Sequence, residues 1–283
     1  MINDISYKAH FGQSKPFQLL RSVITHDLQG SLSMADPNIA FYGFTPVARD
    51  PEILFANHPT ASGDNPKQDL FIAEDFPLPN STLANDVKTF VKKELDEQTF
   101  NHSNRVYIYG VALAKTHFPH WSYDLETYYL ACLLHDIGTA EKYLSTTKLS
   151  FEFKGAIIAR DLILQLGGVE DQADSICDAI VRHQDIFVQG GNITMIGQVL
   201  QLATILDNVG LRANLIHPRL IETTTAAFPR KGWSEHFARV VESELRLKPW
   251  CHTSTFETPN WKEGMKSNFA SDVRKNSVMK SFD

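Results

Sequence analysis

Two apolar segments of the chain each end in residues that can bind a metal ion. The run YYLACLL at 128–134 leads directly into His135 and Asp136, and the run LATIL at 202–206 leads into Asp207. An ionised carboxylate that is buried without a partner costs several kcal/mol. We therefore expect each of these aspartates to face a cation or a dense shell of hydrogen bonds.

A further histidine, His102, lies near the start of a predicted helix whose apolar face turns inward. Together, His102, His135, Asp136 and Asp207 offer imidazole and carboxylate ligands without a thiolate. This mixture suits Zn, Mn or Fe and leaves coordination positions open for water or substrate. Each residue also has an ordinary interpretation, since a buried histidine can be a hydrogen-bonded core residue and an aspartate can cap a helix. The residues alone leave both interpretations open.

The elements that would carry these ligands are nearly all helical. The segment STLANDVKTFVKKELD at 81–96 begins with an N-cap serine, and its apolar residues recur at helical spacing. Later helical segments end in the glycine pairs at 167–168 and 190–191. We find no alternating strand pattern and no internal repeat. The sequence predicts an all-α globule of about seven or eight helices.

The sequence divides into three segments that differ in amino-acid composition and periodicity. Residues 1–80 are rich in Pro, Asn, Asp and Ser and lack periodicity, so we expect an N-terminal arm that is extended or partly disordered. Residues 81–261 form the predicted helical metal-binding domain. Residues 262–283 are polar and mixed in charge, and we expect them to form a C-terminal tail.

Composition excludes several classes of partner. The chain has 283 residues, 27 basic against 33 acidic, and a net charge of -6, which gives no basic surface for nucleic acid or an anionic membrane. No segment approaches the roughly 20 apolar residues that span a bilayer, and no signal peptide is recognisable. The three cysteines are far apart, which indicates reduced thiols in a cytoplasmic protein. We expect a homo-oligomer that binds neither nucleic acid nor membrane.

The order of the motifs resembles that of the HD-domain metallohydrolase superfamily and, more closely, the fungal cyanamide hydratases. The resemblance rests on these segments, quoted in chain order: YGFTPV (42–47), FNHSNRV (100–106), CLLHDIGTAEKY (132–143), STTKLSFEF (145–153), AIVRHQD (179–185), GNITMIGQVLQLATILDNVG (191–210), FPRKGW (228–233) and KPWCHT (248–253). It covers the chain from about residue 80 to the end. One departure lies at 154–156, where Lys-Gly-Ala replaces the expected Tyr-Gly-Gly.

The resemblance implies a hydro-lyase reaction. A metal ion, zinc by analogy, would lower the pKa of a bound water from about 15.7 toward about 7, and this water would add to the nitrile of cyanamide to give urea. Cyanamide detoxification is the implied role. Relatives begin close to the sequence MADPNIAFYGFTPV, which suggests Met34 as an alternative start.

The implied reaction also needs a group that protonates the nitrile nitrogen. His183, in a predicted polar helix end, is the first candidate for this catalytic role, and Lys154 and Thr139 are further ones. Asp185 would hold His183 in place. Thr139 and Asp185 can equally be helix caps.

Two other functions compete with this one. HD domains commonly hydrolyse nucleotides or phosphodiesters, a reaction that calls for several Arg or Lys side chains around the metal. Few basic residues lie near the motifs, and no glycine-rich phosphate loop is present. A purely structural metal is disfavoured because such sites are usually closed and rich in thiolates.

Overall fold

The computed structural model describes residues 36–57, 70–257, 259–260, 265–266 and 268–283. Within these ranges the elements are mostly helices, and the strands form two short antiparallel pairs. The α-helices are α1 (Pro37–Phe41), α2 (Pro51–Asn57), α3 (Thr82–Glu94), α4 (Glu97–His117), α5 (Leu125–Leu134), α6 (Glu141–Leu144), α7 (Phe151–Gln165), α8 (Glu170–Arg182), α9 (Met195–Val209), α10 (Pro218–Ala227), α11 (Trp233–Leu247) and α12 (Phe269–Arg274). The strands are β1 (Pro46–Ala48), β2 (Asn192–Thr194), β3 (Pro259–Asn260) and β4 (Met265–Lys266), and the 3-10 turns are η1 (Ala73–Asp75), η2 (Ile137–Thr139), η3 (Asp185–Phe187), η4 (Ala213–Leu215), η5 (His252–Glu257) and η6 (Lys280–Phe282).

The helix content confirms the predicted fold class. Eight of the helices have ten or more residues, and the remaining four are short. The all-α architecture that the sequence predicts is therefore the observed one. No helix in the described part of the chain is both long enough and apolar enough to cross a membrane.

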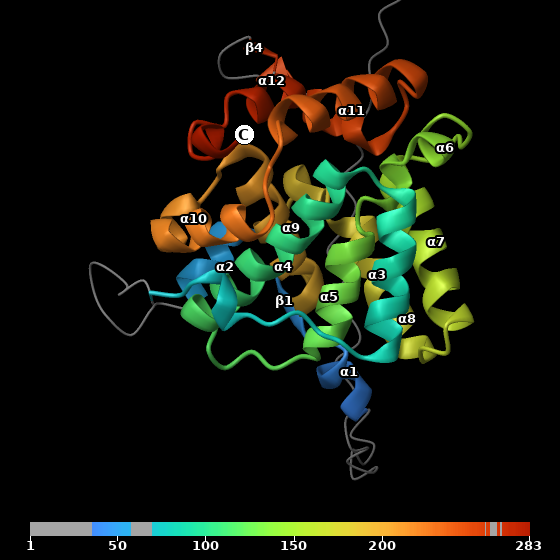
Figure 1. The fold of residues 1–283 in the computed structure, drawn as a ribbon, viewed down its shortest axis with the longest axis vertical. Coiled ribbons are helices and arrows are strands. Elements are labelled where there is room, and N and C mark those ends of the chain that lie inside the picture. Colours follow the sequence, from blue (N-terminus) through green and yellow to red (C-terminus); the bar gives the residue numbers. More distant parts are fainter. Residues whose placement is uncertain (1–35, 58–69, 258, 261–264, 267) are drawn as a thin grey trace, which may run out of the picture. The chain divides into compact units, whose positions relative to one another are not determined.

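The centre of the fold is made by α4, α5 and α9 (Figure 1). Asp124 caps the start of α5, and every residue of that helix from Thr127 to Leu134 is buried. Thr194 caps α9 with its hydroxyl, and α9 ends at Gly210, whose φ of 72° is left-handed. Because α5 is apolar on all sides, its end lies inside the protein, and the residues after Leu134 emerge there.

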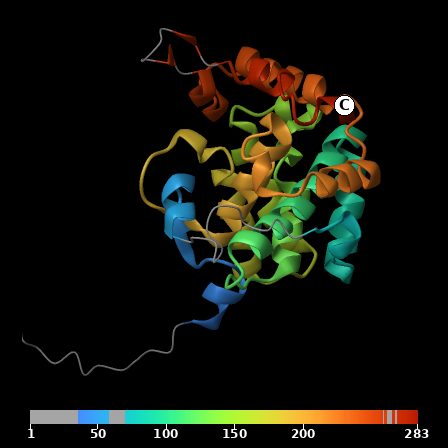
Figure 2. The same cartoon turned by 90° about the vertical axis from the view of Figure 1, so that its left-hand side faces the viewer.

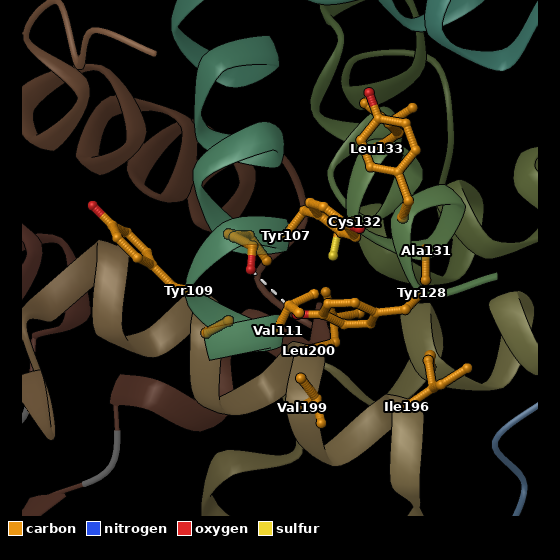
Figure 3. Packing of buried hydrophobic residues seen from close by; sticks show 14 of the residues in the cluster. Tyr107, Tyr109, Val111, Tyr128, Ala131, Cys132, Leu133, Ile196, Val199 and Leu200 are labelled. Carbon is orange, nitrogen blue, oxygen red and sulfur yellow. Dashed lines mark hydrogen bonds between the residues drawn. The ribbon is translucent and has the colours of Figure 1, made fainter. Parts of the chain in front are cut away.

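Buried tyrosines tie α5 to α4 (Figure 3). The Tyr128 hydroxyl donates to the Val106 carbonyl at 3.2 Å, and the Tyr129 hydroxyl donates to Asn104 Oδ1 at 3.3 Å. A buried tyrosine gains from its large apolar ring only if its hydroxyl finds a partner. These two bonds set the relative position of the helices that carry His102 and His135.

The outer helices cover two sides of this centre. Helices α7 and α8 pack against each other and against α5, and α7 also lies against η2. Helices α11 and α12 lie across one end of the central helices in both views (Figures 1 and 2). The functional residues at the end of α5 are therefore enclosed by elements that follow them in the sequence.

The described part of the N-terminal segment packs on the helices, where the sequence predicts an extended arm. Strand β1 pairs with β2, and Val47 and Leu54 are buried in the core. The Arg49 guanidinium donates to the carbonyl oxygens of Asp185 (2.7 Å) and Gly190 (3.2 Å). The described residues from 36 onward belong to one compact unit, and no boundary appears among them at residue 80. The rest of the predicted arm and the alternative start at Met34 lie outside the described residues.

The C-terminal segment also packs, although its composition predicts a polar tail. Phe269 and Val273, four residues apart on α12, are buried against α11, and Met279 is buried further along. Two apolar residues at helical spacing are enough to anchor a short helix, but they are too few to stand out in a polar stretch. Helix α12 and Met279 therefore belong to the core.

Replacing Gly138 by alanine is expected to destabilise the fold where the chain leaves α5. A Cβ at Gly138 would lie 2.0 Å from the carbonyl oxygen of Phe151 on α7, so one backbone segment would have to move. We expect Gly138→Ala to lower the free energy of unfolding by about 3 kcal/mol, measured by urea denaturation followed by circular dichroism.

Gly190→Ala is the matched control for this prediction. No atom lies within 4 Å of a Cβ at Gly190, and only its left-handed φ of 72° penalises alanine, by about 1 kcal/mol. If Gly138→Ala is as stable as this control, the close contact between η2 and α7 does not constrain the fold.

Candidate metal centre

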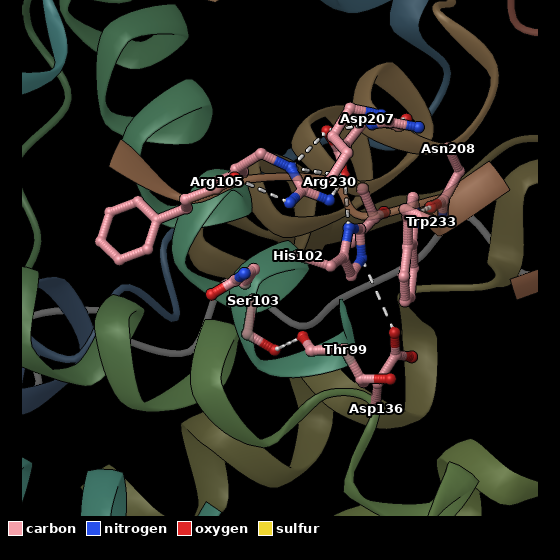
Figure 4. A network of polar contacts seen from close by, with 12 residues as sticks. Thr99, His102, Ser103, Arg105, Asp136, Asp207, Asn208, Arg230 and Trp233 are labelled. Atoms are coloured by element: carbon pink, nitrogen blue, oxygen red, sulfur yellow. Dashed lines mark hydrogen bonds and ion pairs between the residues drawn. The ribbon is translucent and has the colours of Figure 1, made fainter. Parts of the chain in front are cut away.

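Buried residues from four helices and their ends lie close together, and Figure 4 shows three of them, His102, Asp136 and Asp207. His102 lies in the second turn of α4, and Asp207 lies near the end of α9. His135 is the C-cap of α5, with Asp136 directly after it, and His183 is the C-cap of α8. All five side chains are buried. The structure therefore brings His183 to the four residues that the sequence predicts as ligands.

Each of the three histidines is oriented by a hydrogen bond at Nδ1. His135 Nδ1 lies 2.8 Å from the Cys132 carbonyl oxygen, and His183 Nδ1 lies 2.6 Å from the Ile180 carbonyl oxygen. Since a carbonyl only accepts, both Nδ1 atoms carry the proton. In the neutral ring, Nε2 is then left with a free lone pair. His102 follows the same pattern, because its Nδ1 lies 2.6 Å from Asp207 Oδ2.

The Nε2 atoms of these histidines converge on Asp136. His135 Nε2 lies 3.2 Å from Asp136 Oδ2 and 3.2 Å from His102 Nε2, and His102 Nε2 lies 3.6 Å from Asp136 Oδ2. These three ligand atoms are all within 4.8 Å of one another, which is close enough to hold one ion. His183 Nε2 lies at the edge of this group, 3.9 Å from Asp136 Oδ1.

The carboxylate of Asp136 fits a metal ligand by its lack of other partners. Both of its oxygens are buried, and no described residue donates a hydrogen bond to them. Burial alone would raise the pKa of Asp136, but its interactions with His135 and His102 lower it, so the carboxylate is ionised. A buried anion without donors, faced by two imidazole lone pairs, is the arrangement that a divalent metal ion satisfies.

Asp207 lies on the other side of His102 from Asp136 (Figure 4). Its carboxylate accepts from Arg105 Nη2 at 2.8 Å and from Arg230 Nη1 at 2.8 Å, besides the contact with His102 Nδ1. Burial raises the pKa of Asp207, and the two guanidinium groups lower it by more. Asp207 is not in the group of His102, His135 and Asp136, and its direct ligation of a metal stays a prediction.

The ring of His102 is held by stacking as well as by Asp207. The Trp233 ring lies parallel to it, with a centroid distance of 4.3 Å and an interplanar angle of 13°. Arg230 and Trp233 both come from the segment FPRKGW, which the sequence predicts to pack the C-terminal helices, with lining of a pocket as the alternative. The hydrogen bond and the stacking together fix the direction of His102 Nε2.

A small cavity lies beside the group. Its volume is about 10 Å³, which is room for roughly one water molecule. Phenylalanines from α11, η5 and α12 form much of its wall. Polar atoms come from Gln184, which directly precedes η3, and from Thr204 and Asn208 on α9. The lining residues are His135, Asp136, His183, Gln184, Ile186, Thr204, Ile205, Asn208, Phe237, Phe256 and Phe269.

His183 contributes a basic nitrogen to this cavity. Burial is the main cause that lowers the pKa of His183 to about 4. The ring is therefore neutral at pH 7. Because Nδ1 carries the proton, Nε2 is the atom that can accept another one.

The other predicted catalytic residues lie outside the cavity lining. The Thr139 hydroxyl donates to the Asp136 carbonyl oxygen at 2.7 Å and so closes the η2 turn. Asp185 Oδ2 accepts from Arg182 Nε at 3.1 Å, and its Oδ1 lies 3.7 Å from His252 Nε2. No described contact joins Asp185 to His183, so the catalytic roles of both residues stay predictions.

Residues 154–156, where Lys-Gly-Ala replaces the expected Tyr-Gly-Gly, do not line the cavity. Gly155 lies against Gly138, since a Cβ added to it would be 3.2 Å from the Gly138 nitrogen, and Ala156 is fully buried. Lys154 lies on the same helix outside the cavity lining. Its predicted catalytic role stays a prediction, and no contact in the described structure supports it.

Sequence reasoning missed several of the cavity residues. Gln184 directly follows His183, so its position in RHQD was a usable signal. Thr204 lies three residues before Asp207, which is about one helical turn. Phe256 and Phe269 come from segments without a periodic pattern, and only their packing reveals them.

Comparison with known proteins agrees with this geometry. The HD domain family model matches residues 99–209, which include all four predicted ligands. The cyanamide hydratases DDI2 and DDI3 of Saccharomyces cerevisiae are each 42% identical to this chain over 215 residues. Each match covers 76% of this chain and 91% of the relative.

Asp207→Asn is expected to destabilise the protein strongly. The substitution leaves the buried guanidinium group of Arg105 without an anion and leaves Arg230 with Asp283 alone. Breaking a buried ion pair in this way costs about 3–5 kcal/mol. Thermal unfolding followed by circular dichroism measures the effect.

Glu235→Gln is the matched control, because Glu235 also pairs with two arginines, Arg239 and Arg274, but on the surface. We expect its melting temperature to stay close to that of the wild type. Equal melting temperatures for the two variants would show that Asp207 does not hold the arginines in the core.

Proposed function

Because the chain belongs to the cyanamide hydratase family of HD-domain proteins, we propose that it adds water to the nitrile of cyanamide and releases urea. The observation that carries this proposal is the unpartnered carboxylate of Asp136, which lies with two imidazoles beside a cavity of about 10 Å³. A cavity that holds roughly one water molecule excludes large substrates. Its phenylalanine wall suits an uncharged substrate.

The metal would be held by His102 Nε2, His135 Nε2 and the carboxylate of Asp136. Three protein ligands of nitrogen and oxygen type, without thiolate, are typical of catalytic zinc sites and also suit Mn or Fe. When bound, the ion supplies Lewis acidity that lowers the pKa of water from about 15.7 toward about 7. Among these ions we take zinc as the resident one. We take the cytoplasm as the compartment, since all three cysteines are free thiols.

His183 is the proton carrier of the proposed reaction. Its neutral ring accepts a proton from the attacking water at Nε2 as the carbon–oxygen bond forms. The same atom then returns the proton to the nitrile nitrogen, and the resulting isourea rearranges to urea. Thr139 acts through the backbone by holding the turn that carries Asp136. Lys154 and Asp185 have no part in this scheme.

Phosphoester hydrolysis, the competing function, is not supported by the cavity. None of the described residues that line it is a lysine or an arginine. Arg105, which lies in the same motif as His102, is engaged by Asp207 and by the carbonyl oxygen of Phe228. A phosphate would therefore find no charge-assisted donors in the cavity.

Purified protein is expected to form urea from cyanamide and to contain a stoichiometric metal ion. His135→Ala and Asp136→Asn should each lose the metal, measured by inductively coupled plasma mass spectrometry, together with urea formation. Bis(p-nitrophenyl) phosphate should not be hydrolysed. A folded, metal-replete wild type that forms no urea would refute the assignment, and cleavage of the phosphodiester would favour the competing function.

His183→Gln is expected to lower kcat by about 100-fold or more while the metal content stays that of the wild type. His120→Gln, which changes an exposed histidine in the same way, should leave kcat unchanged. If metal and activity disappear together in His183→Gln, the ring is a ligand and not a proton carrier.

A further inference from the structure

A buried polar network stands behind the cavity and reaches it through Gln184. The network contains Glu244 and Lys248 on α11, Thr253 in η5, and Gln184 beside His183, and each of these side chains is at most 4% exposed. Gln184 lines the cavity, whereas the other three residues do not. The hydrogen bonds of this network therefore decide which atom of the Gln184 amide faces a substrate in the cavity.

Glu244 acts as an acceptor throughout this network. Its Oε1 accepts from Lys248 Nζ at 2.9 Å and from the Phe151 amide at 2.7 Å. The buried ammonium of Lys248 has one further partner, the Leu149 carbonyl oxygen at 2.9 Å, which carries no charge. A buried cation needs an anion beside it, so Glu244 is the ionised carboxylate of this pair.

Thr253 lies between Glu244 and Gln184 and contacts both. Its Oγ1 lies 2.5 Å from Glu244 Oε2 and 3.2 Å from the amide position of Gln184 occupied by Oε1. A hydroxyl has one hydrogen, and the shorter, charge-assisted contact with Glu244 takes it. The contact with Gln184 is then a hydrogen bond only if Gln184 donates. A half-turn of the amide provides this donor, which places Nε2 toward Thr253 and the carbonyl oxygen on the side away from it.

Asn208 presents the opposite polarity to the same cavity. The Trp233 indole N–H donates to Asn208 Oδ1 at 2.9 Å, and an indole can only donate. The Asn208 carbonyl oxygen is therefore engaged, and its NH2 group is left as a donor. Two amides in the cavity wall, each fixed by a buried partner, thus offer one acceptor and one donor.

We propose that Gln184 and Asn208 each bind one end of a substrate that carries an N–H beside its nitrile. The Gln184 carbonyl oxygen accepts a hydrogen bond from the substrate's amino group, and the Asn208 NH2 donates to the nitrile nitrogen. The inference rests on the proposed function, and it defines the substrate class as cyanamides with an N–H rather than alkyl nitriles. Thr253 is a positioning residue that acts through Gln184.

The test compares cyanamide with acetonitrile, in which a methyl group of similar size replaces the amino group. Kinetics with cyanamide give kcat and KM, and acetonitrile is measured as a competitive inhibitor. Thr253→Val removes the acceptor that orients Gln184, and Thr253→Ser restores it. Gln184→Met removes the amide at nearly constant volume. Circular dichroism and metal content verify that each variant is folded and loaded.

We expect Thr253→Val to lower kcat/KM for cyanamide about tenfold, the effect of one neutral hydrogen bond, while the Ki of acetonitrile changes less than twofold. Gln184→Met should lose at least as much, and Thr253→Ser should recover most of the wild-type value. Cyanamide kinetics unchanged in Gln184→Met would overturn the proposal, as would equal losses for both compounds in Thr253→Val. Wild-type protein without urea formation would instead refute the proposed function itself.

Discussion

The constraint on which the site depends is a carboxylate buried without a hydrogen-bond donor. Asp136 is placed there because α5 is apolar on every side and ends inside the protein, so the next residues are delivered to the interior. An uncompensated anion in this position would destabilise the fold by several kcal/mol. The surrounding elements are therefore suited to bind a cation, because imidazole nitrogens lie close to the same carboxylate.

Much of the structure serves to fix the direction of those lone pairs. Backbone carbonyls at the ends of α5 and α8 bind the Nδ1 protons of His135 and His183. For His102 the same task falls to Asp207, whose charge is balanced by Arg105 and Arg230. This second buried anion is stabilised by the protein alone. The two aspartates thus have opposite needs, since one is saturated by arginines and the other has no donor.

The C-terminal third of the chain completes the site from the other side. Helix α11 supplies Trp233 against His102, and η5 and α12 supply two of the phenylalanines that limit the cavity. The same elements carry the ion pair of Glu244 and Lys248, whose charges stay in the core behind Thr253. Apart from Asp136, the residues that line the cavity carry no carboxylate, lysine or arginine.

The sequence by itself determined the helical class, the delivery of His135 and Asp136 into the core and the nitrogen and oxygen character of the candidate ligands. These features follow from local patterns, namely apolar runs, caps and glycine stops. Only the tertiary structure decided the partners of each group. The contact between His102 and Asp207 joins residues 105 positions apart, and Thr253 meets Gln184 across 69. Hydrogen-bond direction and cavity shape depend on such long-range contacts, so they could not be predicted from local patterns. For the same reason the packing of the N-terminal segment and of Phe269 became visible only in the fold.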